Sequence, residues 1–303
     1  MGSFSPTPPP QRQRPVAVDP GAQPNPEILR AEENFNPPPP PVRRRRPSWS
    51  YAPATYALVA FNCLIFMVMT LRGVSVWGST ADQLMMYWGA DNAGSVLVYS
   101  QWWRIVTAMF VHVGWIHLLG NMWCLWNLGL LAEPLLGSAG VLAVYILTGA
   151  AGNLLSTFVN WLKYSPSPEW AINHSLTAFP AGAGASGAVF GIAGALIILL
   201  KSHRLPVPPL ELHKLRRSVI YFAAINLVIG FTISLGVVVR HTGVSIDNMA
   251  HLGGFMCGLI FAAPLVPRIG ASRELFLFRR RAATVMVVGM LVLSSFYLAQ
   301  LPR

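Results

Sequence analysis

Long apolar runs alternate with short charged segments along most of the chain. Seven of these runs have 17 or more residues, enough for a helix to cross a hydrocarbon core of about 30 Å. A backbone in lipid must satisfy its own hydrogen bonds, so we predict helices and exclude open sheet. The pattern therefore predicts an all-α polytopic membrane protein with seven transmembrane helices at 54–71, 115–132, 138–162, 184–200, 218–239, 249–266 and 282–301.

Two segments depart from this pattern. Residues 1–50 hold 14 of the 25 prolines and almost no aliphatic side chains, which predicts a disordered tail with polyproline II character. This tail can be a plain linker, or it can be a polyproline II ligand for a partner protein. The long first loop, 72–113, is rich in aromatic residues and should lie partly in the membrane interface. We expect a membrane core over 51–266, followed by a basic loop and a seventh helix over 267–303.

Composition narrows the class of protein. Of the 303 residues, 53% are hydrophobic and only 11% are charged, whereas about a quarter is charged in a soluble domain. The net charge of +11 would suit nucleic acid, but no basic stretch is interleaved with aromatic residues as on a nucleic-acid surface. We expect membrane lipid, and no nucleic acid, around this chain.

The distribution of Lys and Arg predicts the orientation. Segments 1–50, 201–217 and 267–281 hold 17 of the 22 basic residues, and all three fall on one side of a seven-span topology. The positive-inside rule then puts the N-terminus in the cytoplasm and the C-terminus outside, with the cell membrane as the expected location.

No metal or cofactor is expected. The three cysteines lack CxxC spacing and lie in apolar stretches, where they are small hydrophobic side chains. The chain has no HExxH sequence, which disfavours a metalloprotease. These cysteines are Cys63, Cys124 and Cys257.

Polar residues inside the spans form three clusters, and such residues are costly in a membrane. In the first, His117 and Asn121 are four residues apart and share a helix face, with His112 just before them. Both can donate hydrogen bonds. They can equally be structural side chains that bond between helices.

The second cluster surrounds Ser186, between Gly184 and Gly187 at the start of a span. Small residues at this spacing are also ordinary helix-packing motifs. A serine at a helix N-terminus nevertheless lies where free N–H groups and the helix dipole stabilise negative charge. A tetrahedral oxyanion needs that stabilisation.

The third cluster opens the span 249–266. Ala250, Gly254 and Gly258 form a smooth face that would let this helix approach the span of Ser186, so that His251 could reach the serine. By itself, His251 can also be a satisfied interior histidine. Asp247 is expected to cap the helix, and a role in orienting His251 is the alternative.

The three clusters converge in depth. In the predicted topology, His117, Ser186 and His251 all fall in the first turns of spans that run from the outside to the inside. Three unrelated structural roles would give no reason for this agreement.

Taken together, these residues resemble the rhomboid intramembrane serine proteases over about 54–266, the six-helix core. The seventh span is similar to the subgroup with one additional C-terminal helix, so a six-plus-one rhomboid-like bundle is implied. The motifs that carry the resemblance are His112, His117 and Asn121; Gly184, Ser186 and Gly187; Ala250, His251, Gly254 and Gly258; Trp103 and Arg104; and Glu133 and Gly137.

The resemblance implies a Ser–His dyad, with Ser186 as nucleophile and His251 as general base. It also implies an oxyanion hole made by the Ser186 N–H and the side chains of His117 and Asn121, with His112 lining a water-accessible cavity. Asn248 is a further polar group able to hold water there. Phe190 stands where some members carry Tyr, which keeps an aromatic face for His251 and loses a hydroxyl.

We therefore expect an intramembrane serine endopeptidase whose substrates are transmembrane helices, cut near the outer face. The alternative is a catalytically silent relative that binds membrane clients. A transporter is disfavoured, because the interiors of the first and the third to seventh spans carry no charged residue.

Overall fold

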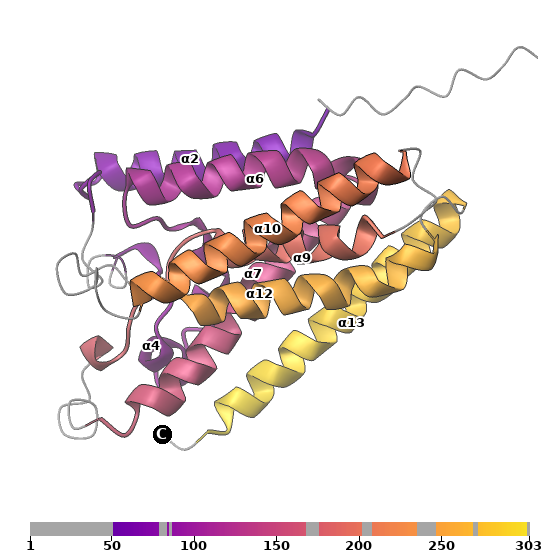
Figure 1. Cartoon of the computed structure of the whole chain (residues 1–303). Helices are drawn as coiled ribbons and strands as arrows, with labels where there is room; N and C mark the ends of the chain where they lie inside the picture. The colour runs from indigo at the N-terminus through magenta and orange to yellow at the C-terminus, as the bar shows by residue number, and fades with distance from the viewer. Residues whose placement is uncertain are drawn as a thin grey trace, which may run out of the picture. The chain divides into compact units, whose positions relative to one another are not determined.

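The computed structural model describes residues 51–78, 84, 87–167, 176–201, 208–234, 247–268 and 272–301. The predicted tail, 1–50, lies outside the described residues. Every regular element within the described ranges is helical, and each of the seven predicted segments overlaps a helix (Figure 1). Residues 235–239 of the fifth predicted segment lie outside the described residues. These helices are α2 (Pro53–Leu71), α6 (Trp115–Leu136), α7 (Ser138–Tyr164), α9 (Ser186–Leu199), α10 (Pro209–Ser234), α12 (Asn248–Ala262) and α13 (Arg273–Ala299).

The protein is an all-α, multi-pass membrane protein. In the described part of the chain, α2, α7, α13 and the stretch Asn248–Val266, which contains α12, are long and apolar enough to cross a membrane. A fifth span would arise if the bent pair Arg104–Phe110 and α6, which meet at 94°, counted as one. The count of seven spans remains a prediction.

Helix α9 is shorter than its predicted segment. It has 14 residues, about 21 Å at 1.5 Å per residue. It begins at Ser186 and not at Gly184, because Gly184 has a φ of 120°, a conformation that a right-handed helix excludes. Hydropathy also placed the starts of α10 and α13 too late, since both helices continue backwards into charged residues.

Helix α9 lies at the centre of the bundle, in contact with α6, α7, α10 and α12, and most of its residues are buried. Its closest neighbour is α12. A methyl group added to Gly254 or Gly258 of α12 would overlap the carbonyl group of Gly187 or Gly191 of α9. The two backbones therefore touch directly through the small residues that the sequence placed on one face of α12.

The first loop carries three short elements, α4 (Ala93–Leu97), α5 (Arg104–Thr107) and η1 (Ala108–Phe110). The aromatic side chains of Trp77, Tyr87 and Trp103 are exposed there. Exposed aromatic rings with a polar edge suit the boundary between lipid and water. Two further short helices are η2 (Leu176–Ala178) and η3 (Ala263–Arg268).

Candidate functional site

The backbone that leads into α9 is held extended by two contacts. Asp91 and Gly182 exchange both backbone hydrogen bonds at 2.8 Å, and the Gly184 N–H donates to the Ala108 carbonyl at 2.9 Å. Gly184 then takes its positive φ, which only glycine adopts freely. As a result, the helix starts at Ser186, whose side chain is partly exposed.

His117 and Asn121 lie beside this turn. A methyl group built on Gly184 would lie 2.8 Å from His117 Nε2 and 3.6 Å from Asn121 Nδ2. The Asn121 amide donates one hydrogen bond to the His117 carbonyl at 3.0 Å. An amide nitrogen carries two donors, so a second N–H remains for a ligand. Both side chains thus flank the residue two positions before Ser186.

His112 is fully buried behind the same turn. Its Nδ1 is 3.3 Å from the Phe110 carbonyl, and its Nε2 accepts the Ala185 N–H at 3.5 Å. Its ring packs edge-on against His117, with centroids 5.2 Å apart. These contacts use both ring nitrogens of His112 to support the turn.

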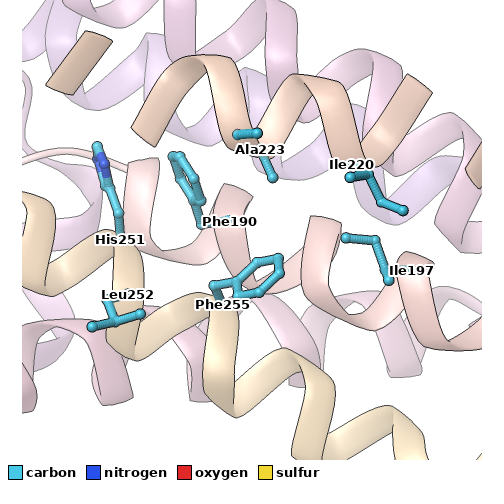
Figure 2. Close-up of a pocket in the computed structure, with 8 residues that line it drawn as sticks. Phe190, Ile197, Ile220, Ala223, His251, Leu252 and Phe255 are labelled. Atoms are coloured by element: carbon cyan, nitrogen blue, oxygen red, sulfur yellow. The ribbon is translucent and has the colours of Figure 1, made fainter. Parts of the chain in front are cut away.

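His251 lies in the first turn of α12 and is buried. The Asp247 carboxylate caps this helix by accepting the N–H groups of Met249 and Ala250 at 3.1 and 3.0 Å. The His251 ring stacks on Phe190 of α9, with centroids 4.4 Å apart and planes at 13° (Figure 2). Asn248, the first residue of α12, is half-buried beside it.

The two helix starts are in direct contact. A methyl group on Gly187, the neighbour of Ser186, would lie 3.2 Å from the carbonyl oxygen of Ala250, the neighbour of His251. Ser186 and His251 are both described and no hydrogen bond joins them in this structure. The His251 Nδ1 atom is buried and has no hydrogen-bond partner among the described residues. The His251 imidazole, one residue along the chain from this contact, thus retains unused hydrogen-bonding capacity.

An apolar pocket of about 180 Å³ lies against His251 and Phe190, between α9, α10 and α12. Figure 2 shows the His251 and Phe190 rings at one end of it, with Ile197 and Ile220 at the other. Its lining is almost wholly hydrocarbon, as expected for a cavity open to acyl chains or to apolar side chains.

The other motif residues lie apart from the serine. Glu133 is 16 residues from His117 on α6, about 24 Å along the helix, and it binds the start of α2 through the Ala54 and Thr55 N–H groups. Gly137 ends α6 with a φ of 73°. These two residues lie at the opposite end of α6 from His117.

Trp103 and Arg104 support the first loop. The Arg104 guanidinium lies over the Trp103 ring, 4.6 Å from its centroid. It also donates to the carbonyl of Ala90 at 2.9 Å. Ala90 precedes Asp91, which pairs with Gly182, so the arginine acts on the turn before Ser186 through two intermediate residues.

Sequence reasoning did not single out Asp91, Ser156 and Thr157. The Thr157 hydroxyl donates to Asp91 at 3.0 Å, and the Ser156 hydroxyl donates to Asp247. Burial, with a contribution from Asp247, raises the pKa of Asp91 to about 7. The only sequence signal for this cluster was a pair of adjacent hydroxyl residues in a predicted membrane span.

The arrangement offers a nucleophile, an imidazole and a set of hydrogen-bond donors at a helix N-terminus, the combination that acyl transfer uses. Among the described residues, no group of three or more His, Cys, Asp or Glu side chains could hold a metal ion.

Comparison with known proteins identifies a family model and several relatives that match most of the described chain. A family model described as the rhomboid domain matches residues 99–268. The chain is 31% identical to rhomboid protease GluP of Bacillus subtilis (strain 168) over 245 residues, which cover 80% of this chain and 40% of GluP. It is 28% identical to rhomboid protease AarA of Providencia stuartii over 210 residues, 69% of this chain and 70% of AarA. It is also similar to rhomboid-like protease 5 of Toxoplasma gondii, at 26% identity over 250 residues, which span 26% of that protein.

Proposed function

Because this chain belongs to the rhomboid family, we propose that it is an intramembrane serine endopeptidase that cuts transmembrane segments of other membrane proteins. The observation that carries the proposal is the contact between the first turns of α9 and α12, with the His251 ring stacked on Phe190. Ser186 and His251 come from segments 65 residues apart, and close backbone packing brings their helix starts together.

In the proposed reaction, Ser186 is the nucleophile and His251 the general base. The imidazole takes the hydroxyl proton as the serine oxygen forms a bond to the scissile carbonyl carbon. The same proton passes to the leaving amine when the C–N bond breaks, which leaves an acyl-serine. A water molecule then attacks the acyl carbon while His251 takes its proton. The proton passes to the Ser186 oxygen when the bond between that oxygen and the acyl carbon breaks, which releases the acid product and free Ser186.

The negative charge on the tetrahedral oxygen is stabilised by three donors. The Ser186 N–H points from the start of α9, where the helix dipole favours an anion. The second amide N–H of Asn121 and an imidazole N–H of His117 are the other two donors, and both side chains lie beside Gly184. Fixed donors in a site screened from bulk water stabilise such a charge strongly.

The dyad hydrogen bond is expected to form when substrate enters. Catalytic hydrogen bonds are often long or poorly aligned without substrate and tighten in the complex. Stacking on Phe190 hinders rotation of the His251 ring about its Cβ–Cγ bond, which favours this alignment. The substrate is a membrane helix that unwinds locally near the outer face, with a small residue at the cut.

The test uses the full chain in liposomes with a model transmembrane substrate. Ser186→Ala should abolish cleavage and labelling by a fluorophosphonate, whereas the matched control Ser294→Ala on α13 should retain both. Cleavage by the Ser186→Ala variant would contradict the proposal. A wild-type protein that neither cleaves nor is labelled would instead support a catalytically silent family member.

The proposed orientation, with the N-terminus in the cytoplasm and the C-terminus outside the cell membrane, has a separate test. A protease-sensitive tag is placed at each end of the chain, and a protease is added outside intact cells. Only the tag at the C-terminus should be digested. Digestion of the N-terminal tag alone would reverse the topology.

A further inference from the structure

A cluster of four polar side chains links the segments that lead to Ser186 and to His251. We call Asp91, Ser156, Thr157 and Asp247 the hydroxyl–carboxyl clamp. Ser156 and Thr157 are adjacent residues of α7 and are 2% and 1% exposed. Their hydroxyls point to different partners, so that one helix holds two other segments at the same level.

One arm of the clamp reaches α12. The Ser156 hydroxyl donates to Asp247 Oδ2, while Asp247 Oδ1 accepts the N–H groups of Met249 and Ala250. The carboxylate therefore fixes both the residue at which α12 begins and its position against α7. His251 follows four residues later, and its backbone N–H donates to the Asp247 carbonyl at 3.2 Å.

The other arm reaches the turn before Ser186. The Thr157 hydroxyl donates to Asp91 Oδ2 at 3.0 Å, and the Asp91 backbone pairs with Gly182 in both directions. Gly182 lies between the two carboxyl groups. A methyl group on it would lie 3.6 Å from Asp247 Oδ2 and 3.8 Å from Asp91 Oδ2.

From this geometry, we infer that Ser156 and Thr157 are positioning residues that hold the Ser186 turn and the His251 helix in register through Asp91 and Asp247. The inference rests on the proposed protease function. Hydroxyl donors suit this task because each can satisfy a buried carboxyl oxygen without adding charge, and a buried carboxyl group without such a partner is costly. Neither side chain touches the reacting atoms.

The experiment measures kcat and KM of the full chain in liposomes, together with the rate of fluorophosphonate labelling at Ser186. Ser156→Ala with Thr157→Val removes both hydroxyls with little change of volume. We expect kcat and the labelling rate to fall about tenfold or more and KM to stay within about twofold, because alignment and not substrate binding is lost. Ser156→Thr keeps a hydroxyl group, so its fall in kcat should be at most half of the fall caused by Ser156→Ala.

Thr284→Val on α13 is the matched control, since its hydroxyl bonds only to the Arg280 carbonyl of its own helix at 2.9 Å. This variant should keep kcat within about twofold. If the double variant does not fold, Thr157→Val and Asp247→Asn are measured singly, and Asp247→Asn, which keeps an oxygen for the helix cap, should lose less than Asp247→Ala.

The outcomes separate the two proposals. Unchanged kcat per folded molecule in the hydroxyl variants, with a wild-type activity that depends on Ser186, overturns the clamp alone. A wild-type activity that survives Ser186→Ala overturns the proposed function and the clamp with it. A fall in thermal stability without a fall in kcat assigns Ser156 and Thr157 to folding only, and also overturns the inference.

Discussion

The two ends of α6 both carry buried polar side chains, but these side chains differ in how completely their hydrogen bonds are made. At one end, the Glu133 carboxylate accepts four hydrogen bonds, from the N–H groups of Ala54 and Thr55 and from the hydroxyls of Thr55 and Ser138. At the other end, Asn121 keeps a free amide donor beside His117, and nearby His251 has a ring nitrogen without a partner among the described residues.

This difference separates structural from functional polar groups inside a membrane. A polar side chain in hydrocarbon is stable when its hydrogen bonds are all made within the protein. Groups left incompletely paired cost free energy, and a structure retains them where a ligand or water completes them. Mutation at the Glu133 end should therefore lower the stability of the protein, whereas mutation at the His117 end should lower its activity.

The largest effect is expected at His251. His251→Ala removes the proposed base and should lower kcat about 10⁴-fold, since the serine hydroxyl is then no longer activated. The variant loses the stacking on Phe190 but no hydrogen bond through Nδ1, so kcat is compared per folded molecule. Cleavage assays and thermal unfolding of the same preparation test this, and near-wild-type kcat would exclude His251 as the base.

Glu133 should show the opposite pattern. Glu133→Ala leaves the Ala54 and Thr55 N–H groups at the start of α2 without their acceptor, at a cost of about 3 kcal/mol or more. Unfolding in detergent should occur at a clearly lower temperature, while kcat per folded molecule stays within about threefold. A selective loss of kcat would place Glu133 in the catalytic machinery and break the comparison.

Packing between the helix starts is tested with two glycines. Gly254→Ala puts a methyl group into the Gly187 carbonyl, whereas Gly120 on α6 has no heavy atom within 4 Å of an added methyl group. Overpacking costs about 1–3 kcal/mol, so Gly254→Ala should lower both stability and kcat, and Gly120→Ala neither. Equal behaviour of the two variants would contradict the direct backbone contact between α9 and α12.

The smallest expected effect concerns pH. Burial raises the pKa of Asp91 from 3.8 to about 7, and the negative charge of Asp247 adds to this rise. The hydrogen bond from Thr157 and the positive charge of Arg104 lower the pKa, but by less. The folded state therefore holds its proton at pH values where the unfolded chain has lost it. The stability contributed is complete below about pH 4 and is lost as the pH rises towards 7.

Asp91→Asn removes this titration and keeps an oxygen for the Thr157 hydroxyl. Between pH 5 and pH 8, the unfolding midpoint of the wild type should fall by more than that of the variant. Parallel pH profiles would show that Asp91 does not titrate in this range.

Sequence patterns located the helices well, because hydropathy and length constrain a chain in lipid more strongly than in water. They located some helix ends well, such as 71, 115 and 138, and others poorly. Gly184 belongs to the predicted span by hydropathy, but its φ excludes it from α9. Charged residues such as Arg279 continue α13 although hydropathy excludes them.

The principal candidate site residues could be proposed from sequence because their signals are local: Asn121 follows His117 by four residues, and small residues surround Ser186. The clamp could not. Thr157 and Asp91 are 66 residues apart, and Ser156 and Asp247 are 91 apart. Neither pair has a periodic pattern, since the match depends on how α7 packs against two other segments.

The shortness of α9 has a consequence for water. Its 14 residues span about 21 Å, about 9 Å less than a typical hydrocarbon core of about 30 Å. Because other helices enclose α9, this difference falls inside the protein and not against lipid. In the proposed orientation we therefore expect Ser186 to lie below the outer membrane surface, at a level that water reaches through the protein interior.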